Sequence, residues 1–112
     1  MVVPQDYQCY AKIVYSMIQF GIYNCEVQIE KYTQGGNVIR LVDAHDGSSV
    51  AVATVNINGL GPNEVAIKHY SENVGLYDVL VNAKVIKPMH REVTQGFVTL
   101  PICILKKNYR CL

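Results

Sequence analysis

The chain has 112 residues, which is enough for one domain with a single hydrophobic core. Half of the residues are hydrophobic and 17% are charged, a composition that excludes an intrinsically disordered chain. The formal net charge of +1 argues against a strongly basic nucleic-acid binder, in which excess positive charge gathers on one face.

The first residues predict a loose arm on a soluble, cytoplasmic protein. Residues 1–10 contain Pro4 and show no hydrophobic period, as is typical of an unpacked terminus. No basic stretch precedes a long apolar run, so we expect no secretory signal. The apolar stretch 10–23 is too short to cross a bilayer and contains Lys12, so we expect no membrane contact.

The first half of the chain has the alternating pattern of β-strands. Cys25, Val27 and Ile29 alternate with polar residues, which predicts a strand with one buried face. Asp46-Gly47 is a hairpin-turn signal between two later strands. The first stretch favours a strand through its β-branched and aromatic residues, although a short helix also fits it. The expected strands cover residues 11–20, 25–32, 38–42 and 50–57.

A short strand over residues 65–70 is followed by a change to helical spacing. Leu76, Val79, Leu80 and Ala83 recur at i, i+3, i+4 and i+7, which predicts one apolar stripe on a helix. We expect a helix over about residues 72–86, packed on one face of the sheet. Ser71 or Asn73 would cap this helix, and Pro88 would stop it.

Residues 97–105 form the last expected strand and contain no charged residue. Pro101 has no amide hydrogen, so it belongs at a sheet edge or a bulge. An uncharged edge pairs readily with another chain, so this strand should be central or covered, most simply in a homodimer. Together these elements predict an α+β fold. It would contain one antiparallel sheet of about five or six strands and one helix, in a single domain, 1–112, that ends in a basic tail, 106–112.

No set of residues specifies a reaction, a cofactor or a metal site. Asp43, His45 and Asp46 share one loop, but a hairpin turn explains them, and the alternating oxygen ligands of an EF-hand are absent. The four cysteines form no C-x-x-C motif and are expected to be reduced, with Cys25 and Cys103 in the core. We therefore expect no catalytic residues, no cofactor and no metal, and predict that the protein is not an enzyme.

The aromatic composition favours a protein partner. Eight tyrosines stand against two phenylalanines and no tryptophan, and tyrosine is enriched at protein interfaces. With so small a net charge, non-specific nucleic-acid binding should be weaker than about 10⁻⁴ M at physiological salt. The candidate partner-binding residues are Tyr70, Glu72, Asn73, Tyr77, His90 and Arg91.

Several runs of the sequence resemble a family of short, uncharacterised bacterial proteins of prophages, plasmids and conjugative elements. The most specific runs are Tyr-Ser-Glu-Asn-Val-Gly at 70–75 and Gly-Phe-Val-Thr-Leu-Pro-Ile-Cys at 96–103. Further runs lie at 27–32, 40–44 and 53–57, so the resemblance spans about residues 17–105. It implies a mobile-element context and carries no activity or cofactor.

Composition and resemblance together lead to one functional expectation and one alternative. We expect a non-enzymatic accessory protein of a phage or mobile element that acts by protein–protein binding, for example as an inhibitor of a host defence system. The alternative is a nucleic-acid-associated accessory protein that uses the sheet and the basic residues Lys106, Lys107 and Arg110.

Overall fold

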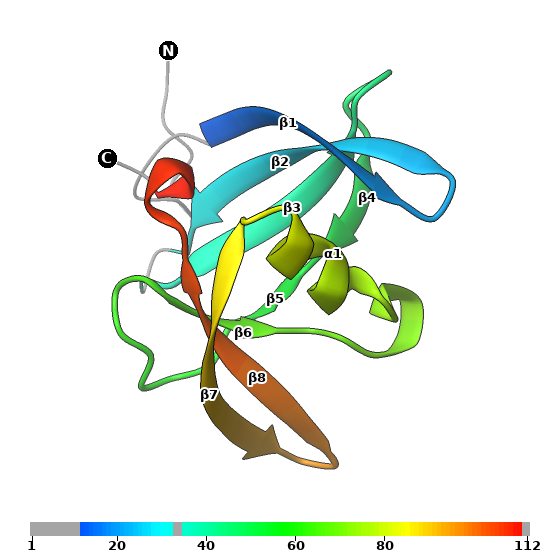
Figure 1. Cartoon of the computed structure of the whole chain (residues 1–112). Helices are drawn as coiled ribbons and strands as arrows, with labels where there is room; N and C mark the ends of the chain where they lie inside the picture. Colours follow the sequence, from blue (N-terminus) through cyan, green and yellow to red (C-terminus); the bar gives the residue numbers. More distant parts are fainter. Residues whose placement is uncertain (1–11, 33–34, 111–112) are drawn as a thin grey trace.

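The structure is a computed structural model that describes residues 12–32 and 35–110 (Figure 1). Within these residues the chain forms eight strands and one α-helix, so the α+β class is confirmed. The strands form two four-stranded antiparallel sheets rather than one sheet of five or six. The predicted arm at residues 1–10 lies outside the described residues.

The first sheet has the order β1-β2-β3-β4. The sequence of residues 11–20 is compatible with either a strand or a short helix. The described part of this stretch forms strand β1. The middle strand β2 follows the predicted alternation, because Cys25, Val27 and Ile29 are fully buried. The strands are β1 (Lys12–Phe20), β2 (Tyr23–Lys31), β3 (Asn37–Asp43) and β4 (Ser49–Val52).

The second sheet has the order β5-β6-β8-β7. Its strands are β5 (Thr54–Val55), β6 (Glu64–Ile67), β7 (Ile86–Gln95) and β8 (Val98–Leu105). The uncharged last strand is therefore central, flanked by β6 and β7, as one of the two predicted arrangements requires. Pro101 pairs with Glu92 of β7 and lies just beyond the β6 ladder, which ends at Ile102. Its missing amide hydrogen therefore interrupts no bond to β6.

The two sheets are joined by a single stretch of chain at Ala53. Residues 50–57 were expected to form one strand, but the structure divides them between β4 and β5. The Ala53 amide donates to the carbonyl of Ile39 (2.8 Å), and its carbonyl accepts from the amide of Lys68 (2.8 Å). One residue thus bonds to a strand of the first sheet and to the end of β6 in the second.

The helix is shorter than the predicted 72–86. A 3₁₀ turn, η1 (Ser71–Asn73), comes first, and Gly75 with φ +88° separates it from α1 (Leu76–Asn82). Neither η1 nor α1 has a side-chain cap, so the predicted capping by Ser71 or Asn73 is wrong. Local sequence offers these residues as caps, but the left-handed Gly75 breaks the helix after them.

The helix also ends before Pro88, which lies in β7. The amide of Lys84 donates to Val81 and that of Val85 donates to Leu80, each at 3.0 Å. These two bonds form a Schellman motif, with Lys84 in the left-handed conformation (φ +62°). This motif, not proline, ends the helix.

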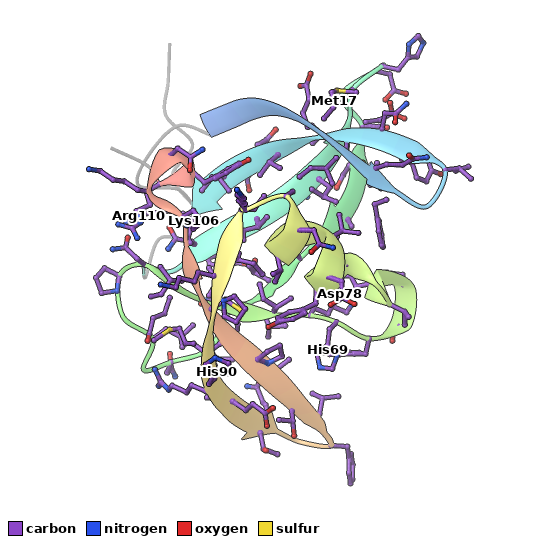
Figure 2. All side chains as sticks on the ribbon, in the orientation of Figure 1. Met17, His69, Asp78, His90, Lys106 and Arg110 are labelled. Atoms are coloured by element: carbon purple, nitrogen blue, oxygen red, sulfur yellow. The ribbon has the colours of Figure 1, made fainter. Side chains whose placement is uncertain are left out.

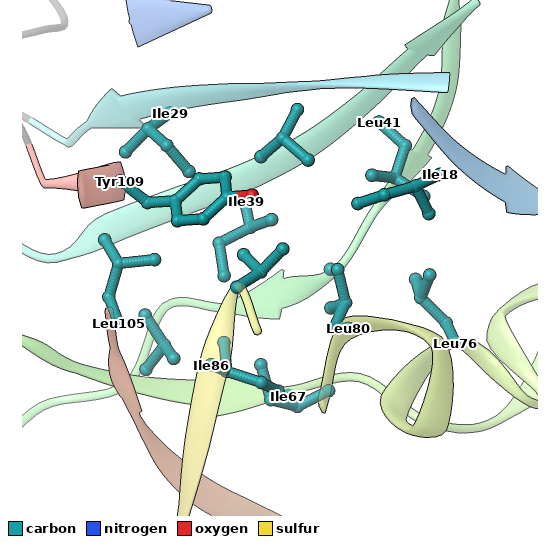
Figure 3. Close-up of a cluster of buried hydrophobic side chains, with 14 of the residues drawn as sticks. Ile18, Ile29, Ile39, Leu41, Ile67, Leu76, Leu80, Ile86, Leu105 and Tyr109 are labelled. Atoms are coloured by element: carbon teal, nitrogen blue, oxygen red, sulfur yellow. The ribbon is translucent and has the colours of Figure 1, made fainter. Parts of the chain in front are cut away.

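The main core lies between the first sheet, α1 and the inner face of the second sheet (Figure 3). Leu76 and Leu80 of the predicted stripe are fully buried. Tyr109 is 2% exposed and comes from a second 3₁₀ turn, η2 (Lys107–Tyr109). The described part of the predicted basic tail, residues 106–110, thus includes a turn whose Tyr109 side chain packs in the core.

Candidate functional site

Two antiparallel strands project past α1 as an arm (Figure 1). We call residues 91–102 the hairpin arm, since Arg91 pairs with Ile102 at its base and Gln95 pairs with Val98 near its tip. Gly96 turns the chain with φ +63°, and the Phe97 side chain next to it is fully exposed. The arm thus carries a large aromatic side chain into solvent.

A β-bulge lies at the base of the arm. Pro88 pairs with Cys103 and Arg91 pairs with Ile102, so Met89 and His90 are extra residues without partners in β8. His90 has a left-handed backbone, φ +56°, which is uncommon for a residue with a side chain. Bulges bend a strand and change the direction of its side chains, and they recur next to functional sites.

A groove runs between α1 and the hairpin arm, on the inner face of the second sheet. It consists of two adjoining hollows, of about 610 and 540 Å³, that share Tyr77, Glu92 and Pro101. The first extends to the bulge, and the second extends toward the end of β6. Figure 2 shows His69 and Asp78 near one another on that side, with His90 on β7. The other lining residues are His69, Gly75, Asp78, Pro88, Met89, His90, Arg91, Thr99 and Ile102.

Three polar residues of this arm groove, His69, Tyr77 and Arg91, interact with other groups of the protein. His69 Nε2 donates to the carbonyl of Thr99 (2.8 Å), as expected of a histidine with a structural role. Burial raises the pKa of Tyr77, and the neighbouring Cys103 contributes. Tyr77 therefore stays a neutral phenol at physiological pH.

Arg91 reaches across the outer face of the sheet to Glu64. Its Nη1 donates to both carboxylate oxygens, at 3.0 and 2.8 Å. A hydrogen bond from the Gly61 amide, and secondly Arg91, lowers the pKa of Glu64. Arg91 is therefore one half of an ion pair on the outer face of the sheet.

The structure brings together only part of the predicted partner-binding set. Tyr77, His90 and Arg91 line the arm groove. Glu72 forms an ion pair with Lys68 at 2.5 Å. The Lys68 ammonium also lies 5.5 Å from the centre of the Tyr70 ring. The last predicted residue, Asn73, is 1% exposed and serves the fold.

The outer face of the second sheet also carries an apolar cluster, which the sequence pattern did not predict. Ala66, Leu100 and Ile102 are buried there, in a cluster separate from the main core. Half-buried apolar side chains surround them: Val55, Ile57, Leu60, Tyr70, Val93 and Val98. Val98, Leu100 and Ile102 alternate with other residues, and this pattern indicates an apolar face on β8. Val93, which packs against the cluster, lies on β7, a strand that the sequence did not predict.

In the described part of the chain, no three potential metal ligands come together, and no helix is both long and apolar enough to cross a membrane. Comparisons with protein-family models, curated proteins and solved structures found no match to this chain. The resemblance to a mobile-element family therefore stays a prediction.

Proposed function

We propose that this chain is a non-enzymatic binding protein that docks on a partner protein through the hairpin arm. The observation that carries the proposal is Phe97, a fully exposed aromatic residue at the tip of a projecting hairpin. Aromatic side chains are enriched at protein interfaces, and a few of them commonly supply most of the binding energy.

The apolar cluster on the outer face of the second sheet supports the same docking surface around Phe97. Val93 and Val98 lie on the arm near Phe97 and pack on the small cluster around Leu100. An apolar surface that continues from a half-buried patch to an exposed tip is more informative than scattered exposed residues. A partner that covers Phe97 can extend its contact along this face.

The outer edge of the sheet argues against strand addition as the mode of contact. β7 forms this edge, and it carries Lys87, Arg91 and Glu92 as well as the bulge. Charges and bulges protect edge strands from pairing with other chains. The partner would therefore contact side chains of the arm rather than extend the sheet.

The flanked position of β8 removes the main argument for a homodimer, so we favour a different protein as the partner. The resemblance described above supports an accessory role in a phage or mobile element. Inhibition of a host defence system is the activity we would test first, because it requires only tight binding to a larger complex.

Capture of partners from host lysate with matched variants tests this proposal. Phe97→Ser removes the exposed aromatic ring, and Ile22→Ser removes another exposed apolar side chain (87% exposed) from the β1–β2 turn. Wild type and Ile22→Ser should retain the same partner, and Phe97→Ser should lose it. The retained partner should then bind purified wild-type protein in calorimetry.

Two outcomes would contradict the proposal. One is a partner that binds Phe97→Ser as tightly as wild type. The other is a partner that both variants lose equally, since this would indicate a general effect of exposed apolar groups.

A further inference from the structure

A third hollow, of about 720 Å³, lies at the opposite end of β8 from the arm tip and shares no residue with the arm groove. Four of its six lining residues are cationic, and none of the described residues that line it is acidic. We call it the cationic hollow; its lining residues are Lys87, Ile104, Lys106, Lys107, Asn108 and Arg110.

The cations of this hollow come from separate elements that the fold holds in place. Lys87 lies on β7 directly opposite Ile104 of β8. The amide of Lys106 donates to the carbonyl of Val85 (2.9 Å), which fixes the chain as it leaves β8. Buried Tyr109 anchors the turn that carries the remaining residues. Figure 2 shows Lys106 and Arg110 next to one another on this side.

The lysine charges at the hollow are uncompensated within the described residues. Lys87, Lys106 and Lys107 form no ion pair with any of these residues. Arg110 donates from Nε to the carbonyl of Leu105 (2.8 Å), which fixes its guanidinium at the rim. Several like charges around one concavity raise the local concentration of anions.

We propose that the cationic hollow binds a small phosphorylated molecule, with the phosphate groups on the lysines. Lysine ammonium groups bind phosphate as mobile point charges. Ile104 and the aliphatic stems of the lysines provide apolar contact for an organic portion of the ligand. A nucleotide has both portions and is the ligand class that fits best.

The distribution of charge favours a small ligand over a nucleic-acid strand. Binding of a long strand requires a basic track along the surface. Here the net charge is only +1, and the described cations Arg40, Lys68 and Arg91 are paired with carboxylates. These three cations therefore do not extend the basic surface of the hollow.

Calorimetry at low salt provides the test, with adenosine triphosphate, inorganic tripolyphosphate, adenosine, and oligothymidylates of increasing length as probes. Adenosine triphosphate should bind most tightly, tripolyphosphate more weakly, and adenosine not at all. Added salt should weaken binding, because the contacts lie near the surface.

Charge-matched variants decide whether the hollow is the site. Lys87→Gln and Lys107→Gln should each weaken binding of adenosine triphosphate about fivefold, as loss of one favourable exposed ion pair predicts. Lys68→Gln is the control, since it removes the same charge beyond the far end of β6. Because Lys87 lies 23 residues before Arg110 in sequence, its effect also separates a folded site from a basic tail.

Three results would overturn the proposal. One is the absence of binding by either polyphosphate probe, and another is equal weakening by Lys68→Gln and Lys87→Gln. The third is affinity that rises steadily with oligothymidylate length beyond that of adenosine triphosphate, which would assign the surface to nucleic acid. None of them affects the role proposed for Phe97.

Discussion

Asn73 connects the end of β4 to the residue that follows β6 through one buried side chain. Its Nδ2 donates to the carbonyls of Val52 (2.8 Å) and Lys68 (3.1 Å), while its Oδ1 has no hydrogen-bond partner among the described residues. The sequence around Asn73 predicts a cap or a contact residue, because asparagine beside a helix commonly caps it. The bonds it actually makes reach residues that local sequence does not reveal.

Asn73→Ala should destabilise the protein by about 1–3 kcal/mol, since two backbone carbonyls lose their donor. Urea unfolding followed by circular dichroism measures this change. Asn58→Ala, at an exposed loop position, is the control and should stay within about 0.5 kcal/mol of wild type. Equal stability of the two variants would contradict the linking role of Asn73.

Glu64 gives the fold a dependence on acid pH. Its pKa is lowered in the folded protein, so its contribution to stability is present above the unfolded-state pKa, about 4.3, and is lost as the pH falls through the lower folded value. Glu64→Gln should therefore lower the free energy of unfolding at pH 7 and show less further loss between about pH 5 and 3. Urea titrations of both proteins across this range test the expectation, which parallel pH profiles would exclude.

At the scale of elements, the C-terminal end of α1 carries an unfavourable residue. Lys84 occupies the left-handed position of the Schellman motif, where glycine is usual. Lys84→Gly should raise the free energy of unfolding by about 0.5–1 kcal/mol, because a side chain is costly in this conformation. Thermal melts measure the change. The control Asn82→Gly, within the helix, should have the opposite sign.

The alternation in β2, the stripe of α1 and the turn at Asp46-Gly47 were predictable, because each depends on neighbours in sequence. β7 was missed for a physical reason. Most of its residues are exposed, since the strand forms an edge and continues into the arm, so no apolar period marks it. The arm groove depends on this strand, and it therefore could not be predicted from the sequence.

At the scale of the whole molecule, the strands are neighbours in the order β1-β2-β3-β4, then β5-β6-β8-β7, with the break at Ala53. The outermost strands of this series are β1 and β7, and α1 contacts both of them. Tyr109 fills another part of the same core, near Ile29 and Leu105 (Figure 3). The helix and the C-terminal turn thus close the interior that the two sheets leave open.

Tyr109→Ala should cost about 3–5 kcal/mol, as loss of a buried aromatic side chain does elsewhere. Equilibrium unfolding in urea measures this cost. Asn108→Ala is the control, because Asn108 is exposed in the same turn. A difference below about 1 kcal/mol between the two variants would show that the turn packs only loosely on the core.

The bonds of Ala53 have a consequence for how the molecule opens. Because this residue is bonded both to β3 and to the end of β6, separating the sheets breaks bonds on either side of it. The sheets should therefore unfold together, in one cooperative step. In native-state hydrogen exchange, the Ala53 amide should exchange only through global unfolding, whereas amides at the arm tip exchange through local fraying.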